Sequence, residues 1–104
     1  MYDFCPKTMV YTSGIQACLE NGEIKDGDLI DCLHRHLLNL GEECKDDNKL
    51  NREAIKNKDG RVVSLFKNCG NRKIFIITDG LHLANDPVYG DEYPATTILL
   101  PEEY

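Results

Sequence analysis

The stretch RVVSLFKNCGNRKIFIIT, residues 61–78, decides the fold of this chain. After Gly60 the period of the apolar residues changes from helical to two, so residues 61–67 and 73–78 are predicted to be strands. Residues 68–71, Asn-Cys-Gly-Asn, are typical of a turn. The sequence therefore predicts an antiparallel β-hairpin.

Beyond the hairpin, residues 95–100 form a predicted third strand, which Pro101 ends because it cannot donate a ladder hydrogen bond. Residues 79–94 connect it to the hairpin and are rich in turn formers. A connection of this length is either a binding loop or an ordinary surface loop. It carries two tyrosines among three acids, which suits an interface: Asp86, Tyr89, Asp91, Glu92 and Tyr93.

Ahead of the hairpin, residues 9–11 indicate a short strand. Thr12 or Ser13 can cap a first helix, which Asn21 and Gly22 end. Asp26 can cap a second helix that Gly41 ends. Its apolar face is predicted to consist of Leu29, Ile30, Leu33, Leu37 and Leu40.

A third, polar helix is predicted from Asp46 or Asp47 to about Lys56, with few residues to bury: Leu50, Ala54 and Ile55. Together the elements predict one α+β domain over residues 1–104, with a helical half at about 12–57 and a hairpin and C-terminal strand at about 61–104. We expect a small antiparallel sheet of three to four strands with about three helices packed on one face.

The charge of the chain is distributed unevenly. Of its 104 residues 29% are charged, with a formal net charge of −6, which argues against binding nucleic acid directly. Residues 1–73 hold 12 acids and 12 Lys or Arg, whereas residues 74–104 hold no Lys or Arg and six acids: Asp79, Asp86, Asp91, Glu92, Glu102 and Glu103. Such a segment can present carboxylates to an arginine-rich groove, or can serve only to keep the protein soluble.

The apolar stretches fall far short of the roughly 20 residues of a membrane helix. The first residues contain no apolar signal-peptide core. We therefore expect a soluble, cytoplasmic protein without a membrane partner.

The cysteines and histidines do not form a recognisable site. Five cysteines without paired spacing are expected to be reduced and mostly buried: Cys5, Cys18, Cys32, Cys44 and Cys69. His34 and His36 lie two residues apart on a helix and point in opposite directions, so they cannot share a metal ion. Cys32 and His36 have helical i, i+4 spacing but lack a further ligand or an orienting group. We expect no metal or cofactor, and we expect His82 to be a solvated loop residue.

The motifs of nucleotide-binding sites and hydrolases are absent from the sequence, which has no GxGxxG, P-loop, GxSxG or HExxH. This absence makes catalysis the less favoured interpretation, and we expect a protein that is not an enzyme.

Three segments carry a resemblance to a known family: GRVVSLF at residues 60–66, KIFIIT at 73–78 and the closing ATTILLPEEY at 95–104. They resemble a family of small proteins carried on plasmids, phages and other mobile elements, and the chain is similar to type II-A anti-CRISPR proteins. Weaker matches are TSG at residues 12–14, Arg35-His36 and residues 51–54. The chain departs from the family at Phe75, where Trp is commoner, and in the longer segment 79–94.

The resemblance implies an inhibitor that binds a type II CRISPR effector nuclease of the bacterial host, with or without guide RNA, and blocks its engagement of DNA or guide RNA. Its carboxylates and aromatic anchors are expected to be Asp86, Tyr89, Asp91, Glu92, Tyr93, Glu102, Glu103 and Tyr104. Two alternatives remain. One is a small ligand-binding or enzymatic counter-defence protein with Cys32, His36 or His82 in its pocket, and the other is an interaction protein of plasmid maintenance.

Overall fold

The predicted hairpin is confirmed in a computed structural model that describes residues 2–104. Strands β2 (Val62–Cys69) and β3 (Arg72–Asp79) pair antiparallel, each slightly longer than expected. The turn is tight because Gly70 has a φ of +60°, and a Cβ there would lie 2.6 Å from the Glu23 carbonyl oxygen. The turn therefore requires glycine.

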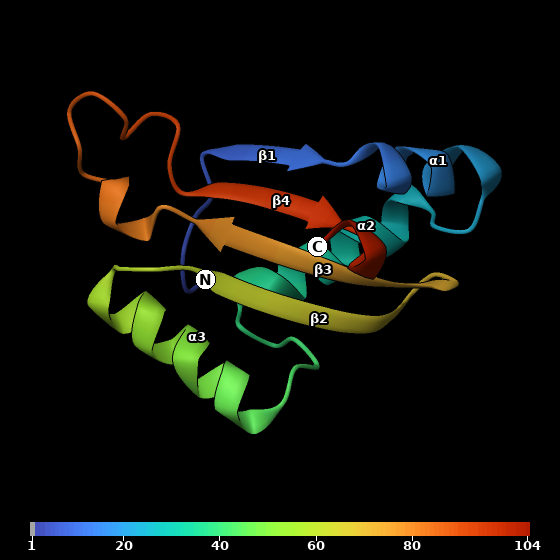
Figure 1. Cartoon of the computed structure of the whole chain (residues 1–104), viewed down its shortest axis with the longest axis horizontal. Coiled ribbons are helices and arrows are strands. Elements are labelled where there is room, and N and C mark those ends of the chain that lie inside the picture. The colour runs from blue at the N-terminus through green and yellow to red at the C-terminus, as the bar shows by residue number, and fades with distance from the viewer. Residues whose placement is uncertain (1) are drawn as a thin grey trace.

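The α+β fold class is also confirmed, with a sheet of four strands in the order β1-β4-β3-β2 (Figure 1). Strand β4 (Ala95–Leu99) pairs antiparallel with β3, but β1 (Thr8–Tyr11) pairs parallel with β4. The sheet is therefore mixed rather than wholly antiparallel as predicted. A parallel neighbour is possible here because the helices and the hairpin lie between β1 and β4 along the chain and carry it back to the same end of the sheet.

Helix α2 (Asp26–Leu37) lies behind one face of the sheet, which we call the inner face, and α1 (Ser13–Asn21) packs at the end of β1 and β4 (Figure 1). Thr12 caps α1 and Gly22 ends it at a φ of +83°, as predicted. The core consists of side chains from both helices, from three strands and from the residues that adjoin them: Ile15, Cys18, Ile24, Leu29, Cys32, Phe66, Cys69, Ile74, Ile76, Ile98 and Leu100.

The predicted apolar face of α2 is partly wrong. Ile30 and Leu40 are 56% and 57% exposed, whereas Cys32 and His36 are buried together with Leu29 and Leu37. The inward stripe follows helical spacing from Leu29 through Cys32 to His36, which turns Ile30 outward. The helix ends at Leu37, before the predicted Gly41, because Asn39 adopts the left-handed conformation with a φ of +55°.

Helix α3 (Lys45–Asn57) lies along the β2 edge of the sheet rather than on the inner face with α2 (Figure 1). Leu50, predicted to be buried, is 61% exposed, while the neighbouring Asn51 is 3% exposed. Asn51 accepts a hydrogen bond from the Val63 N–H at 2.9 Å and donates to the Val63 carbonyl at 2.8 Å. A helix that seals a strand edge thus buries an amide where a helix on an apolar face would bury a leucine.

Replacing Asn51 with Ala is expected to lower the free energy of unfolding by about 2 kcal/mol, because both backbone groups of Val63 lose their partner. Urea denaturation measures this difference. The control is Asn57→Ala at the exposed last residue of the same helix, which should change stability little. Equal effects of the two substitutions would mean that Asn51 does not seal the edge.

Two short 3-10 helices complete the described chain, at Leu81–Leu83 and Pro101–Glu103. Among residues 2–104 no helix is both long and apolar enough to cross a membrane.

Candidate functional site

The predicted site residues fall into two groups at opposite ends of β4. Asp86, Tyr89, Asp91, Glu92 and Tyr93 belong to the segment between β3 and β4, which we call the acidic loop (residues 80–94). Glu102, Glu103 and Tyr104 follow β4. At about 3.3 Å per residue, the five residues of β4 separate the groups by roughly 16 Å, so they do not form one continuous site.

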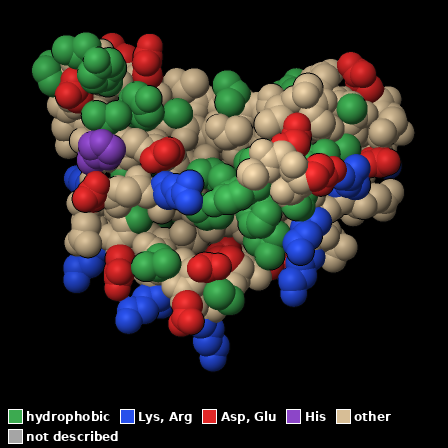
Figure 2. Space-filling model, viewed as in Figure 1, with side chains coloured by type: hydrophobic (Ala, Val, Ile, Leu, Met, Phe, Trp, Pro, Cys, Tyr) green, Lys and Arg blue, Asp and Glu red, His purple; other side chains and the backbone are tan. Residues whose placement is uncertain are grey.

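The acidic loop has a defined backbone rather than an open coil. One carboxylate oxygen of Asp86 accepts hydrogen bonds from the Val88 N–H at 2.7 Å and the Tyr89 N–H at 3.0 Å, so it forms an Asx turn. The turn presents Val88 and Tyr89, which are 74% and 52% exposed, and the exposed carboxylates of Asp91 and Glu92 follow. In Figure 2, hydrophobic and acidic side chains gather at the corner that this loop occupies in Figure 1.

Tyr93 differs from its neighbours because it is half-buried and supports the loop from within. A Cβ on Gly80 would clash with the Tyr93 ring, and Gly80 has a φ of +77°. Glycine is therefore required where the loop leaves β3, and Tyr93 packs against it. The exposed members of this group are Tyr89, Asp91 and Glu92.

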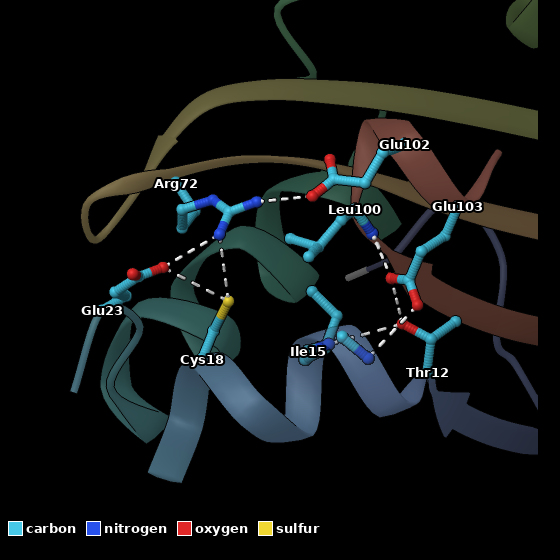
Figure 3. Close-up of polar contacts among 9 residues, drawn as sticks. Thr12, Ile15, Cys18, Glu23, Arg72, Leu100, Glu102 and Glu103 are labelled. Atoms are coloured by element: carbon cyan, nitrogen blue, oxygen red, sulfur yellow. Dashed lines mark hydrogen bonds and ion pairs between the residues drawn. The ribbon is translucent and has the colours of Figure 1, made fainter. Parts of the chain in front are cut away.

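Glu103, at the other end of β4, holds the C-terminal turn onto the start of α1 (Figure 3). Its carboxylate accepts hydrogen bonds from the Thr12 hydroxyl at 2.5 Å, the Leu100 N–H at 3.0 Å and the Gly14 N–H at 3.2 Å. These contacts, led by the Thr12 hydroxyl, lower the pKa of Glu103. The carboxylate is therefore engaged within the molecule.

Glu102 is engaged in the same way, through Arg72 (Figure 3). The Arg72 guanidinium donates to Glu102 at 2.8 Å and to Glu23 at 2.9 Å, and it lies 3.7 Å from the Cys18 sulfur. The hydrogen bond from Arg72 lowers the pKa of Glu23, while burial raises the pKa of Cys18. Arg72 thus links the hairpin, α1 and the C-terminal turn.

Replacing Arg72 with Met is expected to lower the thermal midpoint and the urea midpoint, because two carboxylates lose a charge-assisted hydrogen bond at a partly exposed site. Thermal and urea denaturation measure the loss. The adjacent, exposed Lys73→Met removes the same charge and should change stability by less than about 0.5 kcal/mol. A similar cost for both variants would contradict the role assigned to Arg72.

Tyr104 belongs to a surface that the sequence analysis missed, the outer face of the sheet. Its ring lies 5.2 Å from that of Phe75, and its hydroxyl accepts a hydrogen bond from Arg61 at 3.1 Å. Beside it, a groove of about 630 Å³ runs between the sheet and α3, with Val63, Leu65 and Phe75 among its lining residues. Figure 2 shows hydrophobic side chains across the middle of this face.

A signal for this face was present in the sequence. Residues 62–66 and 74–77 are apolar at almost every position, and such runs are typical of strands with apolar residues on both faces. Val63, Leu65, Phe75 and Ile77, which point to this face, are half-buried, and α2 lies on the opposite face.

His36 is a buried core residue, not a group lining a pocket. Its ring nitrogens lie 2.6 Å from the Ser64 hydroxyl and 2.8 Å from the Thr78 hydroxyl. The Thr78 hydroxyl also forms a hydrogen bond with the Thr96 hydroxyl at 2.7 Å. Burial lowers the pKa of His36 to about 4. The ring is therefore neutral at pH 7, and it forms hydrogen bonds with the two hydroxyl groups that are buried on the inner face of the sheet.

The other candidate residues of this kind are the five cysteines and His82. Cys18, Cys32 and Cys69 are buried and Cys5 and Cys44 exposed, all as free thiols. His82 is exposed in the acidic loop, 3.8 Å from Asp59. Within residues 2–104, no three His, Cys, Asp or Glu side chains are grouped as a metal site requires.

Comparison of the chain with protein-family models, with curated proteins and with solved structures found no match in any of the three.

Proposed function

We propose that this protein is a non-enzymatic inhibitor that binds a type II CRISPR effector nuclease and blocks its engagement of DNA or guide RNA. The observation that carries the proposal is the acidic loop, which exposes Tyr89, Asp91 and Glu92 within a segment, residues 74–104, that contains no Lys or Arg.

The chemistry of the partner favours such a surface. Type II effectors hold their guide–target duplex in a positively charged channel and read the adjacent motif with arginines. Carboxylates pair with arginine through strong bidentate hydrogen bonds, and an exposed tyrosine supplies an apolar anchor beside them. A carboxylate-bearing loop can therefore occupy a site that otherwise receives phosphates.

We assign different roles to the eight residues that were predicted to bind the partner. Tyr89, Asp91 and Glu92 are free to meet a partner, while Asp86 and Tyr93 shape the loop that carries them. Glu102 and Glu103 are engaged by Arg72 and Thr12, so we assign them to stability rather than to binding. We place the protein in the cytoplasm of a bacterial host, where such nucleases act.

Mixing the purified protein with a type II effector tests the proposal. In the presence or absence of guide RNA, we expect co-elution in size-exclusion chromatography and loss of DNA cleavage by the effector. An effector that elutes separately and cleaves at its normal rate would overturn the proposed function for that subtype, and the same outcome across several subtypes would overturn it generally.

The groove on the outer face favours a second candidate, a small ligand-binding protein. Its apolar lining and its volume of about 630 Å³ suit a small molecule, although Cys32, His36 and His82 do not line it. Thermal denaturation with a panel of apolar small molecules tests this candidate. A rise in the midpoint that Leu65→Lys abolishes would support it.

A further inference from the structure

The two edges of the sheet are treated differently by the fold. Along β2, the Leu65 N–H donates to Glu43, the Lys67 N–H donates to Glu42, and Asn51 occupies both backbone groups of Val63. At the opposite edge, β1 has β4 as its one neighbour within residues 2–104, and Figure 1 shows no element beyond it. The β2 edge is sealed, and the β1 edge is open.

The side chains of strand β1 are uncharged and exposed, as in a strand that pairs with a further strand. Met9, Val10 and Tyr11 are 55%, 51% and 49% exposed, and β1 contains no charged residue. Exposed edge strands are normally protected by charge, proline or a covering segment, because their free N–H and C=O groups pair with other strands. Such protection is lacking along these four residues.

The backbone of β1 has groups directed to the open side. Just beyond the strand, the Thr12 N–H donates to the Ile98 carbonyl at 3.1 Å, in register with the pairing of Tyr11 and Ile98, so positions 10 and 12 turn toward β4. The N–H and C=O groups of Met9 and Tyr11 consequently point away from the sheet. An added strand can bond to these groups without displacing any existing hydrogen bond.

The acidic loop lies at the start of this open edge. The Lys7 N–H donates to the Pro94 carbonyl at 2.9 Å, and Thr8 pairs with Ala95, so Asp91 and Glu92 are only a few residues from the beginning of β1. In the view of Figures 1 and 2, β1 lies between this loop and α1, where the upper outline of the molecule dips.

We propose that the β1 edge accepts an extended segment of a partner protein as a fifth strand, with Lys or Arg beside that segment meeting Asp91 and Glu92. Backbone hydrogen bonds would supply affinity and the basic residues would fix orientation. This inference rests on the proposed function in one respect, the use of the acidic loop as a binding surface.

A second copy of this chain is a poorer occupant than a basic partner. Stable dimers bury about 1,200 Å² or more, which a strand of four residues cannot supply alone. Each copy also carries a net charge of −6, so two copies repel one another, whereas a basic segment is attracted.

The test uses synthetic peptides of alternating Thr and Val with two arginines at each end. Binding is followed by NMR, together with the hydrogen exchange of the Met9 and Tyr11 amides. We expect binding that slows exchange at both amides, weakens when serines replace the arginines, and is lost when alternate peptide nitrogens are methylated. Because methylation removes hydrogen-bond donors from the peptide alone, this comparison does not depend on the folding of any protein variant.

Two variants separate the backbone from the side chain. Met9→Pro removes an outward N–H and should weaken peptide binding about tenfold, whereas Met9→Thr keeps the N–H and should bind nearly as the parent does. Unchanged exchange at β1 in the presence of saturating peptide, or equal binding of the methylated peptide, would overturn the inference. Protection of these amides that rises with protein concentration would identify a second copy as the occupant, and would also overturn it.

The same variants keep this inference separate from the proposed function. If this protein binds the peptide at β1 but binds no type II effector, the proposed function is wrong and the edge site remains supported. Effector binding that Met9→Pro leaves unchanged, together with no binding of the arginine-flanked peptides by the parent, would overturn the edge site and leave the proposed function.

Discussion

Lowering the pH from 6.5 to 4 is expected to cost the folded protein about 3 kcal/mol through His36 alone. Burial lowers the pKa of His36 from its usual 6.5 to about 4. Between these values the unfolded chain binds a proton that the folded protein does not, so stability falls as the pH falls. Below about pH 4 both states are protonated, and the contribution of His36 levels off.

Urea denaturation across this pH range measures the effect, with His36→Gln as the comparison. The lowered pKa values of Glu23 and Glu103 also reduce stability in acid, but they act equally in both proteins. The parent should therefore lose about 3 kcal/mol more than the variant between pH 6.5 and 4. Parallel pH curves would contradict the buried, neutral state of His36, as would an NMR titration of its ring near pH 6.5.

The elements whose bounds depend on neighbouring residues in the sequence were predicted correctly. The hairpin follows from its period of two and its glycine turn, and α1 begins at Thr12 and ends at Gly22 as its capping residues indicate. The parallel pairing of β1 with β4 was not predicted, because it joins segments more than 80 residues apart in the sequence and depends on the path of everything between them.

Helix α3 illustrates the same limit at the level of one residue. Sequence reasoning assigned burial to Leu50, the apolar residue, whereas Asn51 is the buried one because it faces an unpaired strand edge. A polar helix residue that pairs with a strand backbone has the same sequence pattern as one that faces water. The requirement arises only when the helix meets the strand.

The candidate site was also predicted in part, for the same reason. Composition alone identified the acidic loop, since its acids lie in a segment free of Lys and Arg. It could not separate Asp91 and Glu92 from Glu102 and Glu103, because the latter are engaged by Arg72 and Thr12, 30 and 91 residues away along the chain. Because of these distant partners, we assign Glu102 and Glu103 to stability rather than to binding.

Reversing the charges of the loop, by Asp91→Lys with Glu92→Lys, is expected to weaken effector binding by about tenfold or more. Both carboxylates are exposed, so the reversal should shift the thermal midpoint little. Added salt should slow association of the parent complex, because exposed charge pairs are screened over about 8 Å at physiological ionic strength. Stopped-flow association at two salt concentrations checks this dependence.

The central claim, that the acidic loop is the binding surface, is tested most directly by one titration of a type II effector, monitored by calorimetry. The parent is compared with the loop reversal and with Asp46→Lys combined with Asp47→Lys, an adjacent exposed pair on α3 that changes the net charge by the same amount. We predict that the loop reversal raises Kd about tenfold or more while the α3 reversal binds as the parent does. Parent-like binding by the loop reversal, with loss in the α3 reversal, would contradict the claim and move the surface to the groove beside α3.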